Sequence, residues 1–126
     1  MHQLNLKVLD GYIQSLVSSI EELDIELISS FSEVLHNKRI SGHKVFIAGN
    51  GGSASTASHF ATDIGIGGLN RTKPVKAVSL CDNSAAITAS ANDNGYDSIF
   101  SDQLTTLCNP GDLLIVITAS GNSMNL

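Results

Sequence analysis

Residues 45–63, which decide the fold of this chain, read VFIAGNGGSASTASHFATD. Val45–Ala48 is a short apolar run of the kind found in strands that are covered on both faces. The three glycines of residues 49–52 permit positive φ angles and a close approach of a ligand to the backbone. We expect Ser53 or Ser55 to cap a helix that follows this turn. The stretch therefore predicts a buried strand, a glycine-rich turn and a helix.

The glycine-rich turn is a candidate anion site. A helix that begins there presents unpaired N–H groups and a partial positive charge, and a phosphate suits both. Two alternatives stay open: a tight turn that binds nothing, and a dinucleotide loop. Gly49, Gly51 and Ala54 loosely fit the dinucleotide pattern G-x-G-x-x-A. The acidic residue expected about 20 positions later is missing, so a nicotinamide site is disfavoured.

Length and composition predict one globular domain over residues 1–126, with a helical segment at 1–42 and the first part of an α/β sheet at 43–126. The net charge of −5 argues against direct binding of nucleic acid. No apolar run approaches the roughly 18 residues of a membrane span. Cys81 and Cys108 have no metal or redox spacing. We expect both to be reduced and partly buried, which fits a cytoplasmic protein.

The N-terminal region has a clear helical period. Apolar residues recur in steps of three and four from Leu6 to Leu27, close to a heptad seam. Asp24 allows a break into two helices. The seam is expected to pack on the chain's own sheet or on a helix of another subunit.

Strands and helices alternate after residue 44. Strands are expected at 45–48, 75–80 and 113–117, with helices from Ser53 to about Ile64, at 84–91 (capped by Asp82 or Asn83) and at 96–107. This order predicts a parallel sheet with helices on both faces, a Rossmann-like or flavodoxin-like three-layer sandwich. The Gly/Ser-rich turns 49–55 and 118–123 each follow a strand, so they should meet at one sheet edge and form one site.

The end of the sequence suggests that the chain is C-terminally truncated. The turn 118–123 should cap a helix, yet only three residues follow it. A sheet of three parallel strands would also leave an apolar edge exposed. We therefore expect these residues to be part of a longer chain.

Six motifs then occur in order: GNGGSA at 49–54, HFA at 59–61, ANDNGY at 91–96, IFS at 99–101, PGD at 110–112 and SGNS at 120–123. Together they resemble the sugar isomerase (SIS) domain of phosphoheptose isomerases. A related bacterial protein that associates with the replication initiator DnaA has a similar pattern. The resemblance is close from Lys44 to Leu126 and loose over the N-terminal helices.

The resemblance implies a homotetramer with sites between subunits, and a conversion of sedoheptulose 7-phosphate to D-glycero-D-manno-heptose 7-phosphate for lipopolysaccharide or surface-glycan synthesis. It implies that zinc is bound by His59 and Asp63, which are also the catalytic candidates. Asp63 occupies the position where the family has a glutamate, whose side chain is longer than that of aspartate by one methylene group. The implied substrate-binding residues are Asn50, Gly51, Gly52, Ser53, Asp93, Thr118, Ser120 and Ser123.

Alternatives remain at this stage. His59 and Asp63 are four residues apart on one helix face, and such pairs are also common as plain surface contacts. They supply two zinc ligands, or one ligand and one base. The alternative function is a non-catalytic phosphosugar-binding or DnaA-associating protein. Residues 1–126 alone are expected to be inactive, because the family's later metal ligands lie outside them.

Overall fold

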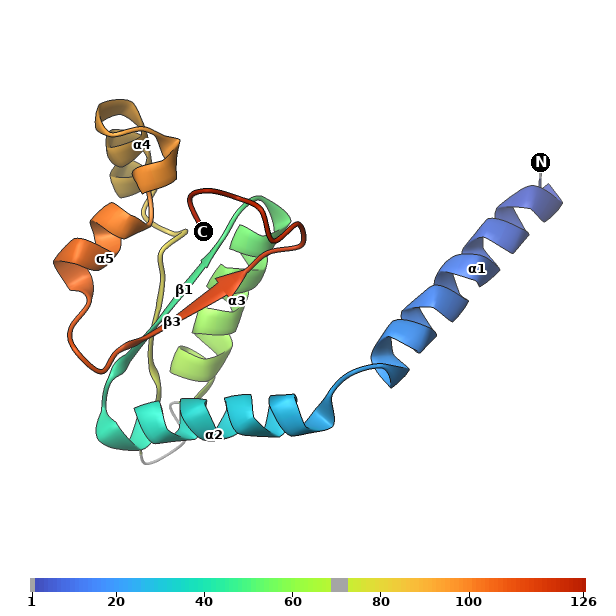
Figure 1. Ribbon diagram of the computed structural model, residues 1–126, viewed down its shortest axis with the longest axis horizontal. Coiled ribbons are helices and arrows are strands. Elements are labelled where there is room, and N and C mark those ends of the chain that lie inside the picture. Colours follow the sequence, from blue (N-terminus) through green and yellow to red (C-terminus); the bar gives the residue numbers. More distant parts are fainter. Residues whose placement is uncertain (1, 69–72) are drawn as a thin grey trace. The chain divides into compact units, whose positions relative to one another are not determined.

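The computed structural model describes residues 2–68 and 73–126, and it divides into two compact units, residues 1–33 and 34–126 (Figure 1). The sequence also predicts a polar loop at 70–74, most of which lies outside the described residues. No helix in the described part of the chain is both long and apolar enough to cross a bilayer.

The first unit contains helix α1 (His2–Glu21) and the start of α2 (Ile25–Ser41). Asp24 separates them as expected. Its Oδ1 accepts hydrogen bonds from the N–H groups of Glu26 and Leu27, each 3.0 Å long, and so satisfies two donors at the start of α2. Apolar side chains of α1 such as Leu9 and Ile13 are more than half exposed. Within this unit, then, the apolar seam has no cover over these residues.

The second unit is built on a parallel sheet of strands β1 (Lys44–Gly49), β2 (Lys76–Ser79) and β3 (Leu113–Ile117), in the order β2-β1-β3. The central strand is the predicted apolar run, and Val45, Phe46 and Ile47 are fully buried. In the register, Ile47 lies opposite Ser79 on one side and Ile115 on the other. The predicted parallel sheet is confirmed.

Side chains of β1 alternate between two apolar clusters. Val45 and Ile47 pack with Ala57 and Ala61 of helix α3 (Gly52–Gly65), which a short 3₁₀ helix η1 (Ile66–Gly68) follows. Phe46 packs on the opposite face with Leu80, which precedes helix α4 (Ser84–Asp93), and with Ile99 and Phe100, which precede helix α5 (Ser101–Leu107). Burial of each of the large side chains Val45, Phe46 and Ile47 stabilises the fold by about 1.5–3 kcal/mol. Helices on both faces confirm the three-layer arrangement (Figure 1).

Three local predictions differ from the structure. The expected helix 96–107 is interrupted, because a 3₁₀ helix η2 (Tyr96–Ser98) precedes α5. Helix α4 extends to Asp93, two residues beyond its expected end at 91. Its cap is Asn83, whose side chain accepts from the Ala86 N–H at 3.0 Å. Cys81 is partly buried as expected, but Cys108 is exposed.

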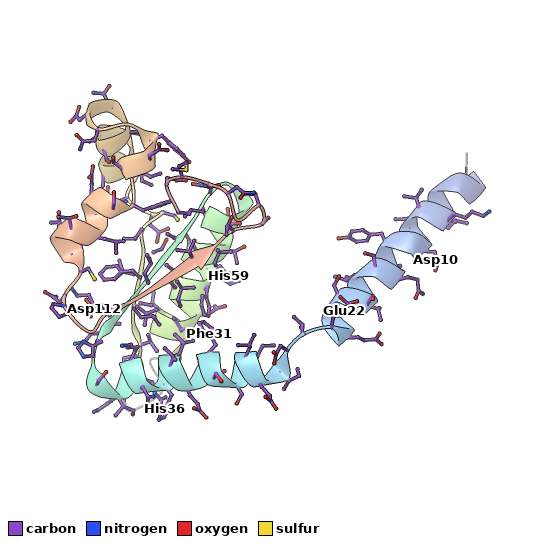
Figure 2. The ribbon with its side chains drawn as sticks, viewed as in Figure 1. Asp10, Glu22, Phe31, His36, His59 and Asp112 are labelled. Carbon is purple, nitrogen blue, oxygen red and sulfur yellow. The ribbon has the colours of Figure 1, made fainter. Side chains whose placement is uncertain are left out.

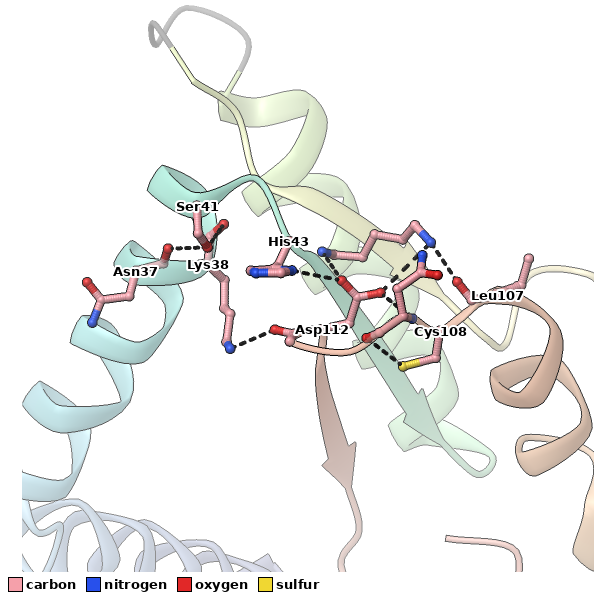
Figure 3. A network of polar contacts seen from close by, with 10 residues as sticks. Asn37, Lys38, Ser41, His43, Leu107, Cys108 and Asp112 are labelled. Atoms are coloured by element: carbon pink, nitrogen blue, oxygen red, sulfur yellow. Dashed lines mark hydrogen bonds and ion pairs between the residues drawn. The ribbon is translucent and has the colours of Figure 1, made fainter.

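Asp112 joins the chain before β3 to the start of β1 at the amino edge of the sheet (Figure 3). Its Oδ1 accepts from the Lys44 N–H at 2.8 Å and lies 3.6 Å from His43 Nδ1, and its Oδ2 accepts from the Asn109 N–H at 2.9 Å. Lys38 Nζ donates to the Gly111 carbonyl nearby, at 2.8 Å. His43 therefore belongs to this network.

Candidate functional site

The two Gly/Ser-rich loops start side by side at the carboxyl edge of the sheet. Gly49, the last residue of β1, is the register partner of Ile117, the last residue of β3. Because the strands are parallel, residues 50–53 and 118–123 leave the sheet at the same edge. This juxtaposition is the one predicted from the order of strands and turns.

Glycine is required at two positions of the first loop. A Cβ on Gly49 would lie 2.6 Å from the Ser53 carbonyl oxygen, closer than real Cβ contacts come. Gly51 has φ 57° and ψ −120°, a conformation that L side chains rarely adopt. Gly51 is also the N-cap of α3, which has no side-chain cap. The predicted cap at Ser53 or Ser55 is therefore wrong, because the backbone closes the turn by itself.

The first loop uses some of its backbone N–H groups within the turn and leaves two others free within the described part of the chain. The Ser53 N–H donates to the Asn50 carbonyl at 3.0 Å, and the Ala54 N–H donates to the Gly51 carbonyl at 3.1 Å, so these two are used. Among the hydrogen bonds of the described residues, the N–H groups of Gly51 and Gly52 have no acceptor, and both residues are exposed. They lie at the positive end of α3, where N–H groups of this kind could hold an anion. The half-buried Ser53 adds a hydroxyl beside them.

The second loop is held by its own hydroxyl groups. Thr118 Oγ1 accepts from the Gly121 N–H at 3.0 Å, and Ser120 Oγ accepts from the Asn122 N–H at 3.3 Å. Each hydroxyl keeps its O–H group as a donor for a ligand. Ser123 is half-buried in the same loop. No helix follows within the described residues, so the expected helix N-terminus at 118–123 is absent from this structure.

Asn50 connects the two loops. Its Nδ2 donates to Asn125 Oδ1, and its Oδ1 accepts from Asn125 Nδ2, both at 2.8 Å. The Tyr96 hydroxyl donates to the same Oδ1 at 3.0 Å. Asn125 is only 8% exposed. The sequence analysis missed Asn125 and Tyr96, since no local pattern marks a contact across 75 positions.

Asp93 ends α4 and is exposed, and its Oδ1 accepts from Asn92 Nδ2 at 2.8 Å. Gly95 follows with φ 93° and turns the chain into η2, whose Tyr96 contacts Asn50. The segment that contains Asp93 therefore approaches the loop site through Tyr96. The predicted sugar contact of Asp93 itself stays a prediction.

His59, labelled in Figure 2, and Asp63 form a pair on α3. His59 Nε2 and Asp63 Oδ1 are 3.5 Å apart, and the side chains are 79% and 64% exposed. Ala57 and Ala61 of the same helix face the sheet instead. The structure thus brings the loop residues together but leaves the His59–Asp63 pair facing solvent within this chain.

The pair meets part of the requirement for zinc. Two ligands of a tetrahedral zinc ion, each at about 2.0–2.2 Å, are roughly 3.4 Å apart, which matches the spacing here. Catalytic zinc sites normally have three protein ligands. In the described part of the chain, no group of three or more His, Cys, Asp or Glu side chains could hold a metal ion.

Ser58 ties α3 to the end of β2. Its hydroxyl donates to Asp82 Oδ1 at 2.5 Å and lies 3.2 Å from Ser79 Oγ. Ser79 Oγ in turn accepts from the Cys81 N–H at 3.1 Å. These contacts fix the helix that contains His59 and Asp63 against the sheet.

The fold defines a parallel α/β domain with two Gly/Ser-rich loops at the carboxyl edge of its sheet. Comparison with known proteins gives the family: the model described as "SIS domain" matches residues 11–126. The chain belongs to the SIS domain family.

Two relatives with similar sequences are both named as phosphoheptose isomerases, one of them as a probable one. A probable phosphoheptose isomerase from Thermoplasma acidophilum is 40% identical over 104 residues, which are 82% of this chain and 57% of the relative. The phosphoheptose isomerase of Shewanella pealeana is 37% identical over 126 residues, 95% of this chain and 62% of the relative. The chain thus spans about three fifths of the length of these relatives.

Two solved structures have the same fold. Phosphoheptose isomerase GmhA from Neisseria gonorrhoeae matches with a TM-score of 0.82 and 32% identity, over 97% of this chain and 64% of that one. A phosphoheptose isomerase from Francisella tularensis matches with a TM-score of 0.87 and 31% identity, over 96% and 65%.

Proposed function

We propose that the protein containing this chain is a sugar-phosphate isomerase that converts sedoheptulose 7-phosphate to D-glycero-D-manno-heptose 7-phosphate. One observation carries the proposal: two backbone donors of one loop lie at the same sheet edge as three hydroxyl residues of the other. The donors are the N–H groups of Gly51 and Gly52, and the hydroxyls belong to Thr118, Ser120 and Ser123. The names of the relatives support the choice of substrate.

The substrate's phosphate would be bound by these donors. Hydrogen bonds to a charged group are each worth about 1.5–3 kcal/mol. Asn50 and Asp93 would contact the sugar hydroxyls. A phosphate held in this way fixes one end of the sugar, so that its carbonyl end is presented to the catalytic groups.

Isomerisation removes a proton beside a carbonyl and returns it to the neighbouring carbon. In this proposal the Asp63 carboxylate accepts the proton, and the His59 imidazole hydrogen-bonds to the oxygen that gains charge. Zinc, if held by these two residues and ligands from outside the described residues, would polarise the carbonyl. Aspartate is one methylene shorter than glutamate, so Asp63 reaches less far from α3.

The exposure of the His59–Asp63 pair supports a site that a second subunit completes. The uncovered apolar side chains of α1 support the same assembly, a homotetramer packed through its N-terminal helices. A cytoplasmic location belongs to the same proposal, since both cysteines are free thiols.

The test is an isomerase assay of the full-length protein with sedoheptulose 7-phosphate and added zinc, with the product identified by NMR. We expect turnover in the wild type and a loss of at least about a hundredfold in Asp63→Asn, the range typical of a general base. Phosphate-dependent binding without turnover would instead support a non-catalytic phosphosugar-binding protein.

A further inference from the structure

Asn50 has almost no free hydrogen-bonding capacity. A side-chain amide offers two lone pairs on oxygen and two N–H donors. Asn125 Nδ2 and the Tyr96 hydroxyl occupy both lone pairs of Asn50 Oδ1, and Asn125 Oδ1 accepts one of the two Nδ2 hydrogens. One N–H group therefore remains for a ligand, and no acceptor.

The partners of Asn50 come from two segments that are distant from it in sequence. Asn125 lies two residues after Ser123, in the chain that leaves β3, and Tyr96 opens η2 after Asp93. Asn50 itself precedes the donors Gly51 and Gly52. Three segments far apart in sequence are thus joined at one amide group.

The reciprocal amide pair is protected from water on the Asn125 side, because Asn125 is 8% exposed. Two hydrogen bonds between the same two planar groups fix the distance and the orientation of both. A buried amide that lost its partner would keep an unsatisfied group. The pair therefore restrains the loop 118–123 relative to Gly51 and Gly52.

We propose that Asn125 and Tyr96 are positioning residues that act through Asn50: the three side chains hold the second loop against the first, so that both present their donors to one phosphate. This rests on the proposed phosphate site. Asn50 would contribute at most a single N–H donor to the ligand, and its main effect would be on the geometry of the loops.

The test uses the full-length protein and two probes, inorganic phosphate and sedoheptulose 7-phosphate, titrated by calorimetry. We expect Asn125→Ala to lower the affinity for both probes by a similar factor, about tenfold for a lost buried hydrogen-bonded pair. Asn50→Ala should lower the affinity for inorganic phosphate by the same factor, and that for sedoheptulose 7-phosphate by at least as much, because its one remaining N–H group is also lost. The double variant should lose no more than about a further twofold, because both changes remove the same contact. In turnover, the loss should appear in KM and leave kcat nearly unchanged.

Two further variants keep the test clear. Tyr96→Phe removes one exposed hydroxyl and leaves the amide pair, so a smaller loss of about two- to threefold is expected, with the fold intact. Asn37→Ala, an exposed asparagine of α2, is the matched control and should change neither affinity. Amide hydrogen exchange should become faster at residues 118–125 in Asn50→Ala and Asn125→Ala but not in Asn37→Ala.

Several results would overturn the positioning role. A loss confined to sedoheptulose 7-phosphate in Asn50→Ala would show that Asn50 acts by touching the sugar. Additive losses in the double variant, or unchanged exchange at 118–125, would show that the pair does not restrain the loop. If the wild type binds inorganic phosphate but not the sugar phosphate, the proposed function fails and the positioning role stands. Binding of neither probe would overturn both.

Discussion

The Asp112 carboxylate accepts a hydrogen bond from the backbone N–H of Lys44, 68 positions earlier in the chain, at 2.8 Å. The contact fastens the turn before β3 to the first residue of β1 (Figure 3). Backbone N–H donors of Asn109 and Lys44, with the charge of Lys44 nearby, hold the pKa of Asp112 below its usual value near 3.8.

A pH dependence of stability follows. Because the folded pKa of Asp112 is lowered, the unfolded chain binds more protons in acid, and stability is lost as pH falls from about 4 through the lowered pKa. In Asp112→Asn the free energy of unfolding should be lower than in the wild type at pH 7. It should also change less between pH 5 and pH 3. Denaturant unfolding across this range measures both, and parallel curves for the two proteins would contradict the assignment.

Gly49→Ala should destabilise the fold by about 1–3 kcal/mol, as overpacking does in a tightly packed site. The added Cβ would lie 2.6 Å from the Ser53 carbonyl oxygen, which the turn cannot move without opening. Gly52→Ala is the matched control, since nothing lies within 4 Å of its Cβ position, and it should be neutral or slightly stabilising. Equal free energies of unfolding for the two variants would refute the close packing of this loop.

We expect zinc binding by the full-length protein to depend on the His59–Asp63 pair on α3. His59→Ala and Asp63→Ala should each lower the zinc affinity of the full-length protein about tenfold or more, because each removes a ligand. His36→Ala removes an exposed histidine of α2 and should have no such effect. Competition with a chelator of known affinity gives the numbers. An unchanged affinity in both site variants would place the metal elsewhere.

The sequence predicted the parts of the fold that local patterns determine. The apolar runs 45–48 and 113–117 became β1 and β3, and Asn83 capped α4 as one of two expected residues. The helix break at Asp24 followed from its capping side chain. Glycines and serines after two strands predicted which loops would meet, because parallel strands place their carboxyl ends together.

Contacts between distant residues could not be predicted in this way. The pairing of Asn50 with Asn125 and of His43 with Asp112 depends on how strands of distant sequence are aligned. The N-cap of α3 was mispredicted because the backbone conformation of Gly51 closes the turn before any serine is needed. The break between η2 and α5 has no marker in the apolar period of residues 96–107.

The central claim is that residues 50–53 and 118–123 form one phosphate site. Calorimetric titration of the full-length protein with sedoheptulose 7-phosphate and with unphosphorylated sedoheptulose tests it most directly, in the wild type and in the double variant Ser120→Ala with Ser123→Ala. We expect the wild type to prefer the phosphorylated sugar strongly, and the double variant to lose at least about a hundredfold of its affinity for that sugar alone, from two charge-assisted hydrogen bonds. Equal affinity of the wild type for the two sugars, or an unchanged affinity of the double variant for the phosphorylated one, would contradict the claim.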